Sequence, residues 1–250
     1  MNEYLKNLNR IEFVVTNSCT GKCKHCSQGE HSGCEYLEKS VAADVIRKIA
    51  GEYNIDSVMT FGGEALLFPE CVCEIHKAAE EVGIKKRQLI TNGYFSEDFK
   101  RIADVAEMLA LGGVNEILLS VDAFHQETIP IEYVIQFAKE IKKNNIPIKT
   151  NPAWLGGEDD NNSFNVITRK ILEQFTSLGI ETGKGNTVFA SGNALKFLGK
   201  YFDLINTEKN PYDEDPYNIK TVSISSDGDV LNGNIYHNDI MEIISLYLPY

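Results

Sequence analysis

The stretch IEFVVTNSCTGKCKHC, residues 11–26, joins an apolar run to a compact group of cysteines. The apolar run is rich in β-branched and aromatic residues and ends at the polar pair Asn17 and Ser18, a pattern that predicts a β-strand over residues 11–16. The cysteines then follow with three and two residues between them, at Cys19, Cys23 and Cys26. Three thiolates this close in sequence can converge on one metal centre only if the loop wraps tightly, and Gly21 favours such a loop.

Outward from this stretch, short apolar runs alternate with helical patterns. Further strands are predicted at residues 57–61, 88–91, 116–121, 146–150 and 187–189. Between them, apolar residues recur at helical spacing, and helix starts are predicted near Ser40, Pro69, Ser96, Ile131 and Val166. Strand starts recur every roughly 30 to 45 residues, the length of a strand, a crossover helix and a parallel strand. The sequence therefore predicts one α/β domain built by repetition.

The last sixty or so residues break this repetition. A short strand at residues 220–224, a turn at residues 226–229 and an apolar segment from Ile240 predict an extension that packs on the barrel or sheet. Residues 206–216 are polar and contain two prolines, which predicts a surface loop. We therefore expect the α/β domain over residues 1–195 and the C-terminal extension over residues 196–250.

Composition and charge disfavour several classes of function. The chain has 250 residues with 24 Lys and Arg against 36 Asp and Glu, a net charge of -12, which disfavours nucleic acid and anionic membranes as partners. Neither an apolar run of about 18 residues nor a signal-peptide core is present, so we expect a cytoplasmic protein without a membrane span. A reducing cytoplasm keeps thiols free, so the six cysteines favour metal or redox chemistry over disulfides.

The cysteine loop alone is compatible with two kinds of metal site. A zinc ion completed by Cys34, His31 or His25 would satisfy the usual four nitrogen or sulfur ligands. An iron-sulfur cluster held by only three cysteines would leave one iron open for a further ligand, as a reactive centre requires.

Polar motifs end the later predicted strands. They are Gly62-Gly63-Glu64 after the second strand, Thr91-Asn92-Gly93 after the third, Ser120-Val121-Asp122 after the fourth and Asn151 after the fifth. In an α/β barrel the functional groups gather at the carboxyl ends of the strands, where all of these motifs fall. Each motif alone is more often a turn or a strand terminus, but their joint placement behind a cysteine loop favours one composite site.

In these motifs the sequence resembles the radical SAM superfamily, whose members carry the same cysteine spacing after the first strand of an incomplete (β/α)6 barrel. The Gly-Gly-Glu triplet matches a family motif, although Ala65 stands where proline is usual. The resemblance implies that Cys19, Cys23 and Cys26 ligate one 4Fe-4S cluster, and that S-adenosylmethionine (SAM) chelates the remaining iron. Reductive cleavage of SAM would then give a deoxyadenosyl radical that removes a hydrogen atom from the substrate.

The resemblance also implies which residues contact SAM. These are His25 near the adenine, the glycines near the methionine amino group, and polar residues at the strand ends near the ribose and carboxylate. The full set is His25, Gly62, Gly63, Glu64, Thr91, Asn92, Ser120, Asp122 and Asn151. His125 and Gln126 would project toward the barrel mouth, where they could touch substrate or cofactor or make a structural hydrogen bond.

The remaining cysteines receive separate interpretations. Cys71 lies on the apolar face of a predicted helix and is expected in the core, whereas Cys73 lies on the polar face and could be partly exposed. Cys34 lies near the predicted mouth, and its role stays open. No cysteine follows Asp227-Gly228-Asp229, where larger relatives place auxiliary clusters, so one cluster is expected.

These observations predict a radical SAM enzyme that abstracts hydrogen from a peptide or protein side chain, or from a small organic substrate. Only ten residues precede the first strand, so we expect peptide recognition by the barrel or by a partner. A flavodoxin-like or ferredoxin-like protein would supply electrons. Activation of a glycyl-radical enzyme and a non-enzymatic zinc-binding protein are the alternatives.

Overall fold

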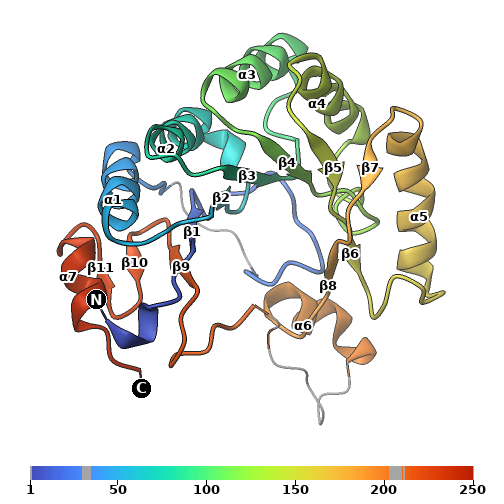
Figure 1. Cartoon of the computed structure of the whole chain (residues 1–250). Helices are drawn as coiled ribbons and strands as arrows, with labels where there is room; N and C mark the ends of the chain where they lie inside the picture. Colours follow the sequence, from blue (N-terminus) through green and yellow to red (C-terminus); the bar gives the residue numbers. More distant parts are fainter. Residues whose placement is uncertain (1, 30–34, 203–209, 211, 250) are drawn as a thin grey trace.

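The structure is a computed structural model that describes residues 2–29, 35–202, 210 and 212–249. Its centre is a seven-stranded sheet in the order β7-β5-β4-β3-β2-β1-β9, in which every neighbouring pair is parallel (Figure 1). The strands are β1 (Arg10–Val14), β2 (Ser57–Phe61), β3 (Lys86–Thr91), β4 (Glu116–Leu119), β5 (Ile148–Thr150), β7 (Glu181–Thr182) and β9 (Thr221–Ile224). From β1 to β5 each strand lies beside its predecessor, as is usual for consecutive strands joined by crossover helices.

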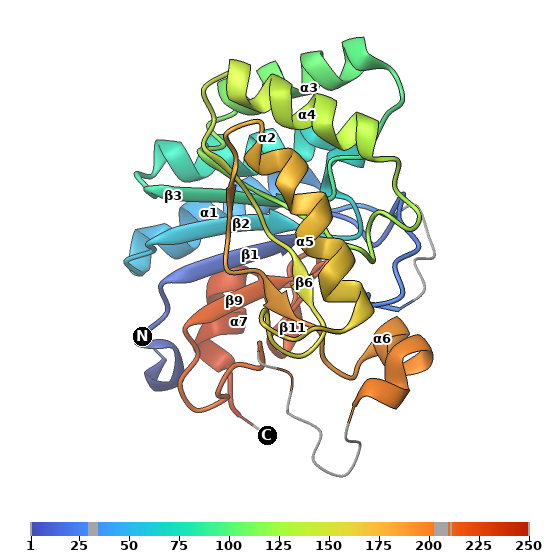
Figure 2. The same cartoon turned by 90° about the vertical axis from the view of Figure 1, so that its right-hand side faces the viewer.

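Helices cover the outer face of this curved sheet (Figures 1 and 2). Neighbours in sequence pack against each other from α1 to α4. The seven α-helices of the described residues are α1 (Lys39–Glu52), α2 (Pro69–Glu81), α3 (Phe99–Leu111), α4 (Ile131–Lys143), α5 (Ser163–Thr176), α6 (Gly192–Leu198) and α7 (Ile240–Leu246). This arrangement confirms the predicted α/β class and the incomplete barrel.

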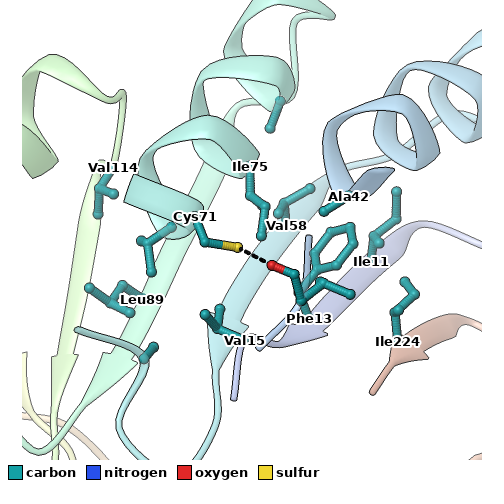
Figure 3. Close-up of a cluster of buried hydrophobic side chains, with 14 of the residues drawn as sticks. Ile11, Phe13, Val15, Ala42, Val58, Cys71, Ile75, Leu89, Val114 and Ile224 are labelled. Atoms are coloured by element: carbon teal, nitrogen blue, oxygen red, sulfur yellow. Dashed lines mark hydrogen bonds between the residues drawn. The ribbon is translucent and has the colours of Figure 1, made fainter. Parts of the chain in front are cut away.

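The two faces of β1 differ in polarity. Ile11 and Phe13 are fully buried and pack with α1 and α2 in the main apolar core (Figure 3). Arg10 and Glu12 alternate with them and therefore point to the inner face, where both side chains are only partly buried. The inner face of the barrel is thus polar at this strand, unlike the packed interior of a complete barrel.

The sixth strand of the sheet lies earlier than predicted. The expected strand at residues 187–189 is replaced by β7, which pairs with β5. After β7 the chain turns away at Gly183 and at Gly185, whose φ is +73°. It then forms β8 (Asn186–Thr187), which pairs with β6 (Ala153–Trp154) in a separate two-stranded sheet. The polar sequence of β7 gave no apolar signal for a strand.

Two predicted helix starts shift by two residues. Glu38 rather than Ser40 caps α1, because its carboxylate accepts hydrogen bonds from the backbone N–H groups of Ser40 and Val41 at 3.1 and 2.9 Å. Asp98 rather than Ser96 caps α3 through the N–H of Lys100 at 2.8 Å. Pro69 occupies the first turn of α2 as predicted.

The C-terminal segment completes the sheet. β9 pairs with β1 over four residues, from Arg10 opposite Thr221 to Phe13 opposite Ile224. A short antiparallel pair, β10 (Asp229–Val230) and β11 (Gly233–Asn234), then leads to α7, which contacts α1. Asn2 ties the two ends of the chain together by donating to the carbonyl groups of Ile244 and Tyr247. In the described part of the chain, no helix has the length and apolar character needed to cross a membrane.

Candidate active site

A pocket of ≈250 Å³ lies at the carboxyl ends of the sheet strands. Its wall contains the three cysteines of the loop after β1, together with eight other residues that the sequence assigned to SAM or placed beside it. These eight are His25, Gly62, Gly63, Thr91, Asn92, Ser120, His125 and Asn151. Residues far apart in sequence thus meet at one site because parallel strands all end at the same edge.

The cysteine loop is held from several sides. The backbone N–H of Asn193, at the start of α6, donates to the carbonyl of Cys26 at 2.9 Å, and the N–H of Lys22 donates to Thr128 Oγ1 at 3.1 Å. Burial raises the pKa of Cys19 to about 11 and also raises that of Cys23. Buried thiols of this kind become thiolates when a metal centre supplies positive charge, so the donor set fits an iron-sulfur cluster.

The two glycines after β2 allow the close approach of two backbone segments. A Cβ atom at Gly63 would lie 2.1 Å from the carbonyl oxygen of Ser18, and one at Gly62 would lie 2.4 Å from that of Thr16. The backbone N–H of Gly63 donates a hydrogen bond to the carbonyl oxygen of Thr16 at 2.8 Å across this contact. The glycines therefore hold the segment that precedes the cysteines against the wall of the pocket.

Glu64 lies behind this wall and links two strand ends. Its side chain is fully buried and accepts hydrogen bonds from Thr91 Oγ1 at 2.7 Å, from the N–H of Asn92 at 2.8 Å and from the N–H of Leu66 at 2.9 Å. Burial raises the pKa of Glu64 to about 7 despite these donors. Glu64 does not border the pocket, so its carboxylate fixes the loops that do.

Asn92 connects the end of β3 to the cysteine loop. Its side-chain amide donates to Thr20 Oγ1 at 3.3 Å and lies 3.6 Å from Cys19 Sγ. Its side-chain oxygen accepts from the N–H of Tyr94 at 2.8 Å. Asn92 therefore orients the first cysteine of the loop.

The imidazole of His125 borders another part of the pocket, and the buried carboxylate of Asp122 holds it there. Asp122 is fully buried, and its carboxylate accepts from His125 Nδ1 at 2.7 Å and from the N–H of Ala153 at 2.9 Å. Burial opposes ionisation of both groups, but their mutual attraction is larger and holds the pKa of Asp122 low and that of His125 high. His125 borders the pocket and Asp122 does not, so the carboxylate fixes the orientation of a ring on the pocket wall.

His25 packs against this pair. Its ring centroid lies 4.7 Å from that of His125 and 5.0 Å from that of Phe124. Burial, reinforced by the charge of His125, lowers the pKa of His25 to about 4. Its Nδ1 atom is buried and has no hydrogen-bond partner among the described residues. The structure therefore places a neutral, largely buried aromatic ring at the edge of the pocket, and its position near the adenine stays a prediction.

A larger chamber of ≈710 Å³ adjoins the pocket on the inner side of the barrel. The two cavities share wall residues that sequence reasoning did not select, among them Gln28, Asn186, Phe189 and Tyr212. Arg10 and Glu12 of β1 lie on the chamber wall. The signal for them was present, because charged residues alternate with buried apolar ones in this central strand.

The other cysteines lie away from the pocket. Cys71 is buried in the main core as expected, where its thiol donates to the carbonyl of Leu37 (Figure 3). Cys73 is partly buried and contacts the carbonyl of Met108 at 3.4 Å. Cys34 and His31, which the zinc interpretation used, lie outside the described residues.

Comparisons with known proteins agree with this geometry. The family model for the Radical SAM superfamily matches residues 13–167. The probable GTP 3',8-cyclase of Saccharolobus solfataricus is 24% identical over 219 residues, which cover 81% of this chain and 67% of that protein. The GTP 3',8-cyclase of Mannheimia succiniciproducens is 29% identical over 157 residues, covering 56% of this chain and 45% of that protein.

Solved structures share the fold. Streptococcus suis SuiB bound to S-adenosylmethionine has a TM-score of 0.64 at 14% identity, covering 98% of this chain and 67% of that one. Native anSMEcpe with bound AdoMet has a TM-score of 0.63 at 14% identity, covering 95% of this chain and 80% of that one. Because the family model spans more than half of the sequence, this chain belongs to the radical SAM superfamily, whose enzymes use a 4Fe-4S cluster and SAM.

Proposed function

We propose that Cys19, Cys23 and Cys26 hold the 4Fe-4S cluster and that SAM binds in the pocket beside them. The observation that carries this proposal is the convergence of the three cysteines on one pocket at the carboxyl ends of the strands. When bound, the cluster and SAM supply the radical chemistry that removes a hydrogen atom from the substrate. The protein's own tasks are to position these groups, to exclude side reactions and to offer the substrate.

Residues around the pocket divide into two groups in this proposal. Those on the wall contact SAM directly, and they are His25, Gly62, Gly63, Thr91, Asn92, Ser120, His125 and Asn151. Glu64 and Asp122 act through other residues, because both carboxylates are fully buried and accept hydrogen bonds from the loops that form the wall.

The substrate in this proposal is an organic molecule that enters the adjoining chamber, with a peptide or protein side chain as our first choice. The position of the chamber supports this, since it shares wall residues with the pocket and would bring a substrate C–H bond next to SAM. The fold accommodates such substrates, because SuiB was also crystallised with its precursor peptide SuiA. A flavodoxin-like or ferredoxin-like protein would deliver the electron.

Cyclisation of GTP is a second candidate. The sequence relatives that cover 81% of the chain are probable GTP 3',8-cyclases, although their identity is only 24%. This candidate predicts that GTP binds to the enzyme and accelerates SAM cleavage.

Anaerobic reconstitution with iron and sulfide tests the proposal. We expect a cluster with iron and sulfide in equal amounts, and formation of 5′-deoxyadenosine and methionine from SAM under a strong reductant. Retention of zinc with four-sulfur coordination, and no cleavage of SAM, would contradict it. Addition of GTP to the same assay then separates the two candidate functions.

A further inference from the structure

The charge and polarity of the large chamber restrict the chemistry of its ligand. The described residues on its wall include three carboxylates, Glu12, Asp213 and Glu214, against one guanidinium, Arg10. Arg10 is already engaged, since its Nε donates to Glu12 Oε1 at 2.6 Å and its Nη2 lies 3.0 Å from Met59 Sδ. A polyanion would therefore meet a net repulsion in this space, whereas a cation would be attracted.

Glu12 retains an acceptor for such a cation. An ionised carboxylate has about four lone-pair positions, and Arg10 uses one oxygen only. Within the described residues, no donor reaches Glu12 Oε2. The side chain is 23% exposed, and the chamber is the space that it faces. A carboxylate oxygen left open toward an internal cavity is a site for a charge-assisted hydrogen bond.

Hydroxyl groups from the neighbouring strand stand beside this oxygen. In the parallel pair of β1 and β9, Glu12 lies opposite Ser223 and Arg10 lies opposite Thr221. Both hydroxyl side chains line the chamber, and no described side chain or backbone group bonds to either of them. An ammonium group has three donors to place. The Glu12 carboxylate and the Ser223 hydroxyl offer adjacent acceptors for two of them.

We propose that the substrate carries a primary amine that binds between Glu12 and Ser223, two residues that line the chamber but not the pocket. This inference rests on the proposed function and narrows its substrate class to an organic cation without phosphate groups. The amide side chains of Asn151 and Asn186, nearer the pocket, would then border the part of the substrate that faces SAM.

Small probes test the proposal on the reconstituted enzyme with SAM bound. We would measure dissociation constants of n-pentylammonium, of its neutral isostere pentan-1-ol and of GTP by ligand-observed NMR titration. The proposal predicts that pentylammonium binds at least about tenfold more tightly than pentanol, and that GTP binds more weakly than pentylammonium. Equal affinity for the amine and the alcohol, absence of amine binding, or tighter binding of GTP would overturn it.

Variants localise the effect. Glu12→Gln should weaken pentylammonium binding about tenfold without changing pentanol binding, and Ser223→Ala should weaken it by a smaller factor. Glu107→Gln, an exposed carboxylate of α3 outside the chamber, makes the same change in net charge and should leave both constants unchanged. If Glu12→Gln does not fold, the dissociation constant of pentylammonium for Ser223→Ala tests the proposal by itself. An unchanged constant in the folded chamber variants would overturn the proposal.

A second measurement distinguishes failure of the amine proposal from failure of the proposed function. Cleavage of SAM by the wild-type enzyme, measured without any probe, reports on the cluster and the cofactor pocket. If SAM is not cleaved, the proposed function fails. If SAM is cleaved but the amine has no advantage over the alcohol, only the amine assignment fails.

Discussion

His125 Nδ1 lies 2.7 Å from Asp122 Oδ2, and this hydrogen bond fixes the orientation of the imidazole on the pocket wall. The carboxylate also accepts from the N–H groups of Phe124 and Ala153, so its position is set by two separate segments. The pair thus couples the end of β4 to the segment after β5 at the edge of the pocket.

Asp122→Asn should reduce the rate of SAM cleavage. The amide cannot hold His125 in the same tautomer with the same strength, and loss of a supporting partner of this kind costs about 10- to 100-fold in activity. The rate of 5′-deoxyadenosine formation at equal cluster content measures this effect. Asp104→Asn, an exposed residue of α3, is the matched control and should retain the wild-type rate. A wild-type rate in Asp122→Asn would show that the pair has no influence on the pocket.

Gly63→Ala should prevent assembly of the site. The added methyl group would overlap the carbonyl oxygen of Ser18 at 2.1 Å, and because both atoms belong to backbone, the loop must move. We expect loss of cluster binding and a lower unfolding temperature. Gly51→Ala is the control, since nothing lies within 4 Å of its Cβ position, and this helical substitution should stabilise α1 by up to about 1 kcal/mol. Equal cluster content in the two variants would contradict this role for Gly63.

The stability of the metal-free protein should depend on Glu64. Its pKa is raised by burial to about 7, above the usual value near 4.3 in an unfolded chain. As pH rises, Glu64 therefore loses its proton in the unfolded state before it does so in the folded state. Ionisation in the unfolded state lowers the free energy of unfolding between about pH 4.5 and about pH 7.

Comparison with Glu64→Gln isolates this contribution. The variant lacks the ionisation, so its stability relative to wild type should improve by about 2.5 kcal/mol between pH 5 and pH 8, where most of the effect of the raised pKa develops. At pH 5 it should be less stable than wild type by about 1 to 3 kcal/mol, because its NH2 group opposes a backbone N–H. Urea denaturation at both pH values measures the difference. A difference that does not change with pH would exclude a raised pKa.

The sequence predicted the site better than the chamber beside it. Cys19, Gly63 and Asn92 could be predicted as site residues because each follows closely after a strand that is rich in β-branched and other apolar residues. The carboxyl ends of parallel strands meet at one edge of the sheet, so these residues come together. Arg10 and Glu12 gave a weaker signal. Their alternation with Ile11 indicates an inner polar face, but only the curvature of the sheet and the position of β9 show that this face borders a cavity.

The errors in the fold arose where local signals compete with tertiary packing. The polar residues of β7 form a strand only because β5 offers an edge for pairing. In α5, Ile167 is 49% exposed while Leu172 is buried, although both side chains are apolar. Spacing alone could not separate these neighbouring positions on the helix.

The hydrogen bond between Asp122 and His125 could not be predicted from the sequence either. Both residues were noticed, but a helix-entry histidine can point to solvent or back to its own strand. In the folded protein the Asp122 carboxylate is buried and accepts a hydrogen bond from the N–H of Ala153, which belongs to a different segment. This tertiary contact places the carboxylate where His125 can donate to it.

The central claim is that three cysteines of one loop hold the reactive cluster. Its most direct test is SAM cleavage by anaerobically reconstituted Cys19→Ala, Cys23→Ala and Cys26→Ala, measured beside Cys73→Ala, whose thiol lies on α2 away from the pocket. We predict that each loop variant loses the cluster and forms no 5′-deoxyadenosine, whereas Cys73→Ala keeps both cluster and cleavage. Cleavage at the wild-type rate by any of the three loop variants would contradict the account.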